Sequence, residues 1–290
     1  MIYCPVCHSS SHPIFQKHSH WIHSCESCKH RFTETPFNAE HITHVYNDDY
    51  FHGGKAGYPD YLRESKILYA RGQYYADLIK PYSSPGSILD VGAAAGFILK
   101  GFIDSGWNGT GLEPNSTMVE YARNRLSLEM EMGSLEEYHT SQIFDLVTMI
   151  QVVPHFYDIR KAFATTARIT RNNGFWLIET WDKDSLLAKL LGKRWHEYSP
   201  PSVLHWFSKK TLTLLANQFG FRLIARGRPQ KKINGAHAKS LLMHKDSGEK
   251  KKKIRDIMIN KIPDEKVFPY PAFDLFWILF QKNGRSEGVT

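Results

Sequence analysis

Short apolar runs alternate with segments of helical periodicity through the middle of the chain. The apolar runs predict strands at 87–91, 108–113, 128–132, 143–150 and 173–180. Apolar positions at helical spacing predict helices near 96–105, 115–126 and 158–171. Strands and helices that follow one another in this way form a sheet with crossover connections. The pattern therefore predicts the α/β fold class.

The same periodicities extend to both flanks of this region. Residues 61–80 predict a helix, and the turn-rich PYSSPG ends it. The apolar face of this helix consists of Leu68, Tyr75, Leu78 and Ile79. A helix at 208–219, with Ser208 as its N-cap, precedes the strand GFRLIARG. The sequence DLFWILFQK, at 274–282, predicts a final buried strand.

A long segment separates these last two strands. Because a structureless loop of about 40 residues is uncommon within a compact domain, we expect a helical insert at about 229–272, with helices AHAKSLLMH and KKIRDIMINKI. We expect it to cover the carboxyl edge of the sheet, with Arg228, Lys231 and Lys232 facing an anionic acceptor group. The alternative is a peripheral helical pair whose lysines face water.

Size and composition limit the class of protein. With 290 residues and 42% hydrophobic content, the chain can form one large core with a small appendage. No apolar run approaches the roughly 20 residues that span a bilayer. The first residues, MIYCPVCH, do not form a secretory leader. We therefore expect a cytoplasmic protein without a transmembrane segment.

The net charge of +8 is unevenly distributed. Residues 1–220 hold 21 Lys/Arg and 22 Asp/Glu, whereas residues 221–290 hold 16 and 7. The run from Lys250 to Lys253 fits a solvated face. The alternative is contact with an anionic partner, which could be a nucleotide-linked substrate, nucleic acid or a membrane surface. Charge alone does not choose among these.

All four cysteines lie within the first 28 residues, as two CxxC pairs: Cys4, Cys7, Cys25 and Cys28. Seventeen residues separate the pairs, which matches the spacing of a tetrahedral four-thiolate zinc site. The alternatives are two disulfides, which are disfavoured in a cytosolic chain, and four unrelated buried thiols, against which the clustering of the cysteines argues. A neighbouring histidine could also replace one thiolate. We predict a structural zinc ribbon whose folding depends on the metal.

The sequence ILDVGAAAGFIL joins a strand, a small-residue turn and a helix. It contains neither a phosphate loop nor the GxGxxG of a dinucleotide fold. Asp90, at the carboxyl end of the strand, would repel a pyrophosphate but suits a ligand with ammonium and sulfonium charges, such as S-adenosylmethionine. Glu113 ends the next strand and could accept both ribose hydroxyls. Helix capping is the structural alternative for each acid.

Several motifs in order carry a family resemblance: the CxxC pairs, YNDDYFHGG, ILDVGAAAGFIL, GLEPN, FDLVTMIQVVPHFYD, NNGFWLIET and HWFSKKTLTLLANQFGF. The chain resembles class I S-adenosylmethionine-dependent methyltransferases, and within them a bacterial group with an N-terminal zinc ribbon. The resemblance implies a Rossmann-like sheet of seven strands, mostly parallel, with the last strand antiparallel. It also implies a zinc ribbon at 1–33, an aromatic linker and lead-in helix at 34–80, and the methyltransferase domain at 81–290.

Carried over by position, the resemblance assigns a set of cofactor-binding residues. The acid-and-glycine loop falls on Asp90, Gly92, Ala94 and Gly96, with Ala94 in place of the usual central glycine. The remaining positions are Glu113 and Pro114 at the ribose, Ser134 and Leu135 at the adenine, and Gln151 and Val152 at the methionyl end. Tyr50, in the aromatic linker, could close over the cofactor or simply pack.

Methyl transfer from a sulfonium is an in-line displacement, so positioning can dominate and a base is needed only for a weakly acidic acceptor. His155, after the fourth strand, is the first candidate base, and His205 is the second. Relatives often have an acid directly before His155, where this chain has Pro154. A structural role is the alternative for both histidines. Trp195, His196 and Tyr198 could form an aromatic wall of the acceptor site.

Three functions follow from these features. The first is methylation of a small-molecule acceptor, such as a sugar or a cell-surface or secondary-metabolite precursor. The second is RNA methylation, with the ribbon and the basic C-terminal quarter binding phosphates and a steep salt dependence. The third is a non-catalytic scaffold, which an intact cofactor loop argues against. The sequence sets neither the acceptor atom nor the oligomeric state.

Overall fold

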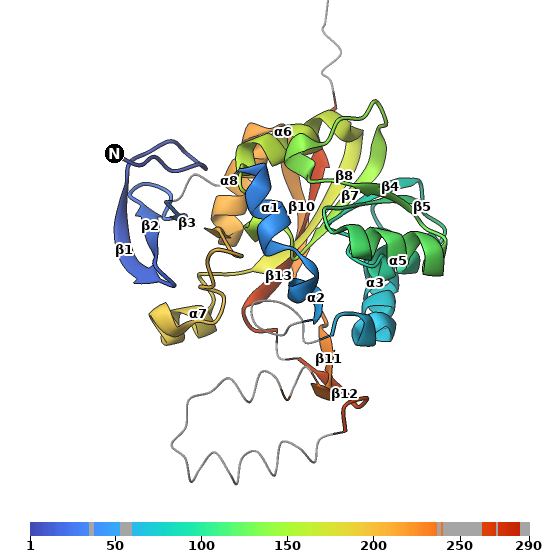
Figure 1. The fold of residues 1–290 in the computed structure, drawn as a ribbon. Helices are drawn as coiled ribbons and strands as arrows, with labels where there is room; N and C mark the ends of the chain where they lie inside the picture. The colour runs from blue at the N-terminus through green and yellow to red at the C-terminus, as the bar shows by residue number, and fades with distance from the viewer. Residues whose placement is uncertain (35–37, 53–59, 237–238, 240–262, 271, 285–290) are drawn as a thin grey trace, which may run out of the picture.

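A computed structural model describes residues 1–34, 38–52, 60–236, 239, 263–270 and 272–284. Its central sheet has the strand order β10-β13-β8-β7-β4-β5-β6 (Figure 1). The strands are β4 (Ser87–Val91), β5 (Asn108–Glu113), β6 (Glu129–Met132), β7 (Phe144–Ile150), β8 (Thr170–Trp181), β10 (Phe221–Gly227) and β13 (Leu275–Lys282). Only β13 runs antiparallel to its neighbours among these seven described strands. The predicted mostly parallel sheet with an antiparallel last strand is confirmed.

Helices cover both faces of this sheet. On one face lie α3 (Ser65–Ile79), α4 (Phe97–Ile103) and α5 (Ser116–Leu126), and on the other α6 (Ile159–Ile169) and α8 (Lys209–Gln218). Trp176 and Leu177, adjacent on β8, belong to the two different cores because strand side chains alternate between faces. Ser208 caps α8 as predicted, since its Oγ accepts from the Thr211 N–H.

The N-terminal ribbon is continuous with the main domain. β1 (Ser11–Lys17), β2 (His20–Cys25) and β3 (Arg31–Thr33) form an antiparallel sheet whose fourth strand is β9 (His205–Trp206). Cys25 and Phe32 of the ribbon share a buried cluster with Phe207 and Leu212 of the main domain. The ribbon therefore packs as an extension of one core.

The aromatic segment 34–60 differs from the linker that the sequence predicts. It contains α1 (Ala39–Val45), capped by Asn38, and α2 (Asp48–His52). Phe51 is buried in the same core as α3 and α4. The helices were missed because they are very short, so that tertiary packing and not periodicity maintains them.

The remaining described elements connect these parts. They are the helix α7 (Leu186–Leu191), the 3₁₀ turns η1 (Leu62–Glu64), η2 (Leu135–Glu137), η3 (Val153–His155) and η4 (Gly192–Arg194), and the short strands β11 (Lys232–Asn234) and β12 (Val267–Pro269). β11 pairs with β12, so an antiparallel ladder closes the predicted insert. Apart from Ala236 and Lys239, the two predicted insert helices lie outside the described residues. None of the described helices is long and apolar enough to cross a membrane.

Candidate active site

A turn in left-handed backbone conformation follows β4 at the carboxyl edge of the sheet. Gly92, Ala94 and Gly96 have φ angles of +66°, +47° and +79°. A Cβ at Gly92 would lie 2.5 Å from Val152 Cγ2, and one at Gly96 would lie 2.4 Å from Leu128 Cδ1. Both positions have the positive φ that favours glycine, and at Gly92 the β-branched Val152 also leaves no space for a Cβ. Ala94 accepts its left-handed conformation at a cost of about 1 kcal/mol, which explains how a methyl group replaces the usual glycine.

Two buried carboxylates flank this turn. Asp90 Oδ1 accepts from the Thr148 hydroxyl at 2.6 Å. Glu113 accepts from the Ala94 N–H at 2.8 Å and from the Asn115 N–H at 2.9 Å. Burial raises the pKa of Asp90 and of Glu113 to about 7, and the nearby charge of Asp90 contributes to the shift at Glu113. Within the described part of the chain, no lysine or arginine forms an ion pair with either acid.

The other residues assigned to the cofactor by position lie at the same edge. Gln151, with φ +63°, donates its backbone N–H to the Glu179 carbonyl at 2.8 Å, and Val152 faces Gly92. The Gly133 N–H donates to the Glu113 carbonyl at 3.0 Å, which ties the end of β5 to the turn before Ser134. Leu135 is buried, and Pro114 directly follows Glu113.

The helices α1 and α2 are bonded to this edge. The Asn115 side-chain amide donates to the Tyr46 carbonyl at 3.0 Å and to Asp48 Oδ1 at 3.1 Å. The Tyr46 ring packs edge-on against Tyr50 at 5.0 Å and against His155 at 5.7 Å. Tyr50 is thus placed near the carboxyl edge by an aromatic cluster, and α2 lies in front of the sheet (Figure 1).

His155 lies beside this cluster. Its Nδ1 is 2.6 Å from the Ser202 carbonyl oxygen, which fixes a proton on that nitrogen. Burial lowers the pKa of His155, although the carbonyls of Ser202 and Gln151 oppose the shift. The ring is therefore neutral at neutral pH, and both carbonyls would stabilise it once it accepted a proton.

The structure places His205 elsewhere. Its Nε2 is 3.1 Å from the Phe156 carbonyl, and its Nδ1 is 3.4 Å from His30 Nε2 in the contact between ribbon and main domain. Burial lowers the pKa of His205 to about 4. This arrangement fits a structural histidine. Trp195 and Tyr198 are likewise buried against the ribbon, so that only His196 of the expected aromatic wall remains exposed.

A buried ion pair lies beside Gln151, and the sequence pattern did not predict it. Glu179 of β8, fully buried, accepts from Arg71 and Tyr75 of α3 and from Gln151 Nε2, the last at 3.0 Å. The local signal was a charge within each of two apolar stretches, in WLIETW and on the inner face of α3. Because these stretches are far apart in sequence, that signal could not identify the partner.

Lys231 extends this polar cluster toward the insert. Its ammonium lies 5.1 Å from the ring centres of both Trp181 and Tyr270. Burial and the charge of Arg71 lower the pKa of Lys231 to about 8. Lys232, by contrast, is exposed, and Arg228 lies over the ring of Phe273. Of the three basic residues expected at the acceptor, Lys231 is the one whose ammonium lies between two aromatic rings near the carboxyl end of β8.

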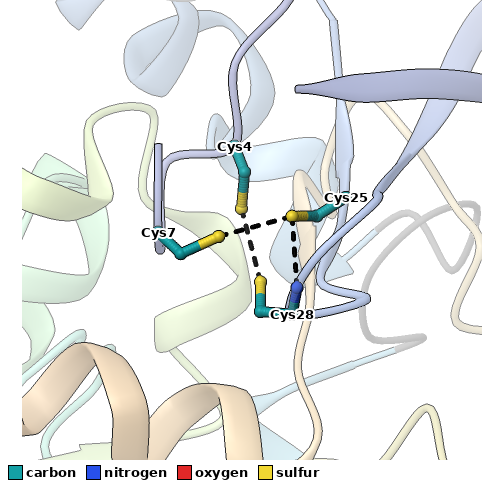
Figure 2. A group of neighbouring side chains, drawn as sticks. All are labelled: Cys4, Cys7, Cys25 and Cys28. Atoms are coloured by element: carbon teal, nitrogen blue, oxygen red, sulfur yellow. Dashed lines mark hydrogen bonds between the residues drawn. The ribbon is translucent and has the colours of Figure 1, made fainter. Parts of the chain in front are cut away.

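The four cysteines converge at the end of the ribbon that packs against the main domain (Figure 2). Their sulfurs lie within 4.8 Å of one another, none is in a disulfide, and the shortest separations are 3.4 and 3.6 Å. A tetrahedral zinc ion with Zn–S bonds of about 2.3 Å would set sulfurs about 3.8 Å apart. The donor set and its spacing therefore fit such an ion.

Comparisons with known proteins agree with this fold. A family model described as a methyltransferase domain matches residues 67–226. The ubiquinone biosynthesis O-methyltransferase of Rickettsia prowazekii is 27% identical over 154 residues, which are 50% of this chain and 59% of that relative. This chain thus spans less than two thirds of that relative.

Two solved structures share the fold at low sequence identity. The YcgJ protein of Bacillus subtilis is 18% identical, with a TM-score of 0.51 over 74% of this chain and 99% of that one. The N-methyltransferase NodS of Bradyrhizobium japonicum, solved with S-adenosyl-L-homocysteine, is 12% identical, with a TM-score of 0.51 over 81% and 99%.

Proposed function

The chain belongs to the methyltransferase-domain family, and we propose that it transfers a methyl group from S-adenosylmethionine to a small-molecule acceptor with an anionic group. One observation carries this proposal. Asp90 and Glu113 are buried carboxylates at the ends of adjacent strands, and no cation pairs with either in the described residues. A buried anion without a partner is unfavourable, so the site is complementary to a cationic ligand.

Each assigned residue then has a role in binding the donor. Asp90 and Glu113 would bind the ammonium and the ribose, while Gln151 and Val152 would line the methionyl end. The bound donor would supply an electrophilic methyl group on a sulfonium. Helices α1 and α2, held through Asn115, would exclude water from the site. The hydrogen bond between His155 Nδ1 and the Ser202 carbonyl orients the ring, which suits His155 to accept a proton from a hydroxyl group of the methyl acceptor.

Lys231 supports an anionic acceptor. In the described part of the chain, no carboxylate lies within ion-pair distance of its ammonium, although Glu64, Glu197 and Asp274 raise its pKa from further away. It therefore offers a charge to a ligand bound near the carboxyl end of β8. The named activity of the Rickettsia relative, O-methylation in ubiquinone biosynthesis, supports a small acceptor. We propose zinc, held by the four cysteines, as a structural ion only, because four thiolates leave no open coordination position.

The test supplies donor with a labelled methyl group to the purified protein and to fractions of a cell extract. We expect label in the low-mass fraction, with Asp90→Asn and Lys231→Ala each reducing it about tenfold or more. Lys232→Ala, which alters the exposed neighbour, should retain full incorporation. Label in a ribonuclease-sensitive fraction, falling steeply with salt, would instead identify an RNA methyltransferase.

A further inference from the structure

A surface segment after β8 exposes leucines in a way that folding of the chain does not require. The segment consists of α7 and η4, residues 186–194, and we call it the leucine segment. Leu186 is 74% exposed, Leu190 is 76% exposed and Leu191 is 39% exposed. Isolated exposed leucines are ordinary, but several within two helical turns form an apolar patch.

The leucine segment is firmly held on its other side. Ser185 caps α7 by accepting from the Ala188 N–H at 3.1 Å. Ala188 and Trp195 are buried with Ile22 of the ribbon, and the Trp195 indole donates to Asp274 at 2.8 Å. Figure 1 shows α7 at the margin of the molecule, below the ribbon. The outward leucines therefore belong to a packed helix with one buried and one exposed face.

Basic residues accompany the exposed leucines. Lys189, Lys193 and Arg194 are exposed, and the sequence LLAKLLGKR contains no acid. The nearest preceding acid, Asp184, pairs with Lys183 at 2.7 Å. These cations form no ion pair with the acids that the structure describes. Exposed leucines among such cations are complementary to an anionic lipid surface, where leucines enter the headgroup region and cations contact phosphates. A protein interface fits less well, because lysine is depleted from such interfaces.

We propose that the leucine segment docks the protein on a bilayer surface that contains anionic phospholipids. The candidate acceptor site lies close to this surface in the fold. Trp181, whose ring faces Lys231, packs against the same buried cluster that anchors Ala188. Docking would therefore bring Trp181 and Lys231, at the carboxyl end of β8, close to the membrane, from which an amphiphilic acceptor could enter. The docking itself does not depend on methyl transfer.

Vesicle sedimentation of the full chain tests this proposal. We expect binding to vesicles of phosphatidylglycerol and phosphatidylcholine, and weaker binding to phosphatidylcholine alone or at high salt. The double variant Leu186→Asp/Leu190→Asp should lower the partition coefficient by roughly tenfold or more. Lys193→Glu/Arg194→Glu should lower it by a similar factor, roughly tenfold, and reduce the salt dependence.

Matched controls come from α8, where Leu214 is 37% exposed and Lys210 is exposed. Leu214→Asp and Lys210→Glu should bind vesicles as the wild type does, and unchanged circular dichroism would show that each variant folds. Absence of wild-type binding, or equal binding by all variants, would overturn the proposal. So would a dimer in gel filtration that the leucine changes dissociate without any vesicle binding, since the partner would then be a second copy. None of these outcomes depends on the methyl acceptor.

Discussion

At the scale of single residues, binding of the methyl donor depends on two carboxyl groups and their protons. Burial raises the pKa of Asp90 and Glu113 to about 7, well above the values expected in an unfolded chain. Near neutral pH each group is therefore divided between its neutral and charged forms. A cationic ligand binds the charged forms, so its binding and the loss of protons are linked.

The affinity for S-adenosylmethionine should consequently rise with pH. Between about pH 6 and 8 we expect a gain of up to roughly tenfold per pH unit for each titrating acid, with proton release on binding. Calorimetric titrations in buffers of different ionisation enthalpy measure both quantities. An affinity that does not vary over this range would contradict the linkage.

Stability of the ligand-free protein should respond to pH in the opposite direction. The folded pKa values exceed the unfolded ones, so the folded state holds more protons between about pH 4 and 7. The stabilisation from these groups is fully present below about pH 4 and is lost as the pH rises through 7. Asp90→Asn should remove part of this dependence in urea unfolding, and an unchanged pH profile would refute the assignment to Asp90.

Glu113 should differ from Asp90 in its effect on folding. Glu113 accepts two backbone N–H groups across the turn, whereas Asp90 accepts from the Thr148 hydroxyl. Glu113→Gln should therefore lower the free energy of unfolding by about 1–3 kcal/mol. Asp90→Asn, which keeps an acceptor for Thr148, should lower it less, and equal losses in urea titrations would argue against this distinction.

At the scale of elements, periodicity predicted what repeats locally and missed what depends on a distant partner. β4 and β5 match the predicted ranges 87–91 and 108–113, with Asp90 and Glu113 at their carboxyl ends. β9 escaped prediction because two residues become a strand only through pairing with β3. The acids of the candidate site could be predicted since each marks a strand end. Glu179 could not be assigned, because its partner Arg71 lies on a separate element.

The Arg71–Glu179 pair joins α3 to β8, and its loss should be costly. Glu179→Gln leaves Arg71 as a buried charge without its partner, so the free energy of unfolding should fall by about 3–5 kcal/mol. The double variant Arg71→Met/Glu179→Leu should recover much of this loss, because neither charge then remains buried. Chemical denaturation of the three proteins measures the coupling, and strictly additive losses would show that the residues act independently.

At the scale of the whole molecule, the ribbon and the main domain share both a sheet and a core. β9 completes the ribbon sheet, and Cys4 and Cys25 belong to the same buried cluster as Leu212. A change at the cysteine cluster should therefore extend beyond the ribbon. This continuity distinguishes the chain from one with an independent N-terminal module.

We expect about one zinc ion per chain by metal analysis, bound through thiolates. Chelation should lower the thermal midpoint of the entire protein in a single transition, since the metal contributes folding free energy to a shared core. Four freely titratable thiols in a metal-free protein of unchanged stability would refute the zinc assignment. A separate low-temperature transition would instead show that the ribbon unfolds independently.

The central claim is that the two buried carboxylates bind a cationic methyl donor. Calorimetric titration of the wild-type protein at about pH 8 with S-adenosylmethionine, and separately with NAD, tests it directly, because the acids should both be charged under these conditions. We predict one donor molecule bound per chain, about tenfold or more weaker binding to Asp90→Asn, and no binding of NAD. Binding of NAD without binding of S-adenosylmethionine would contradict the account.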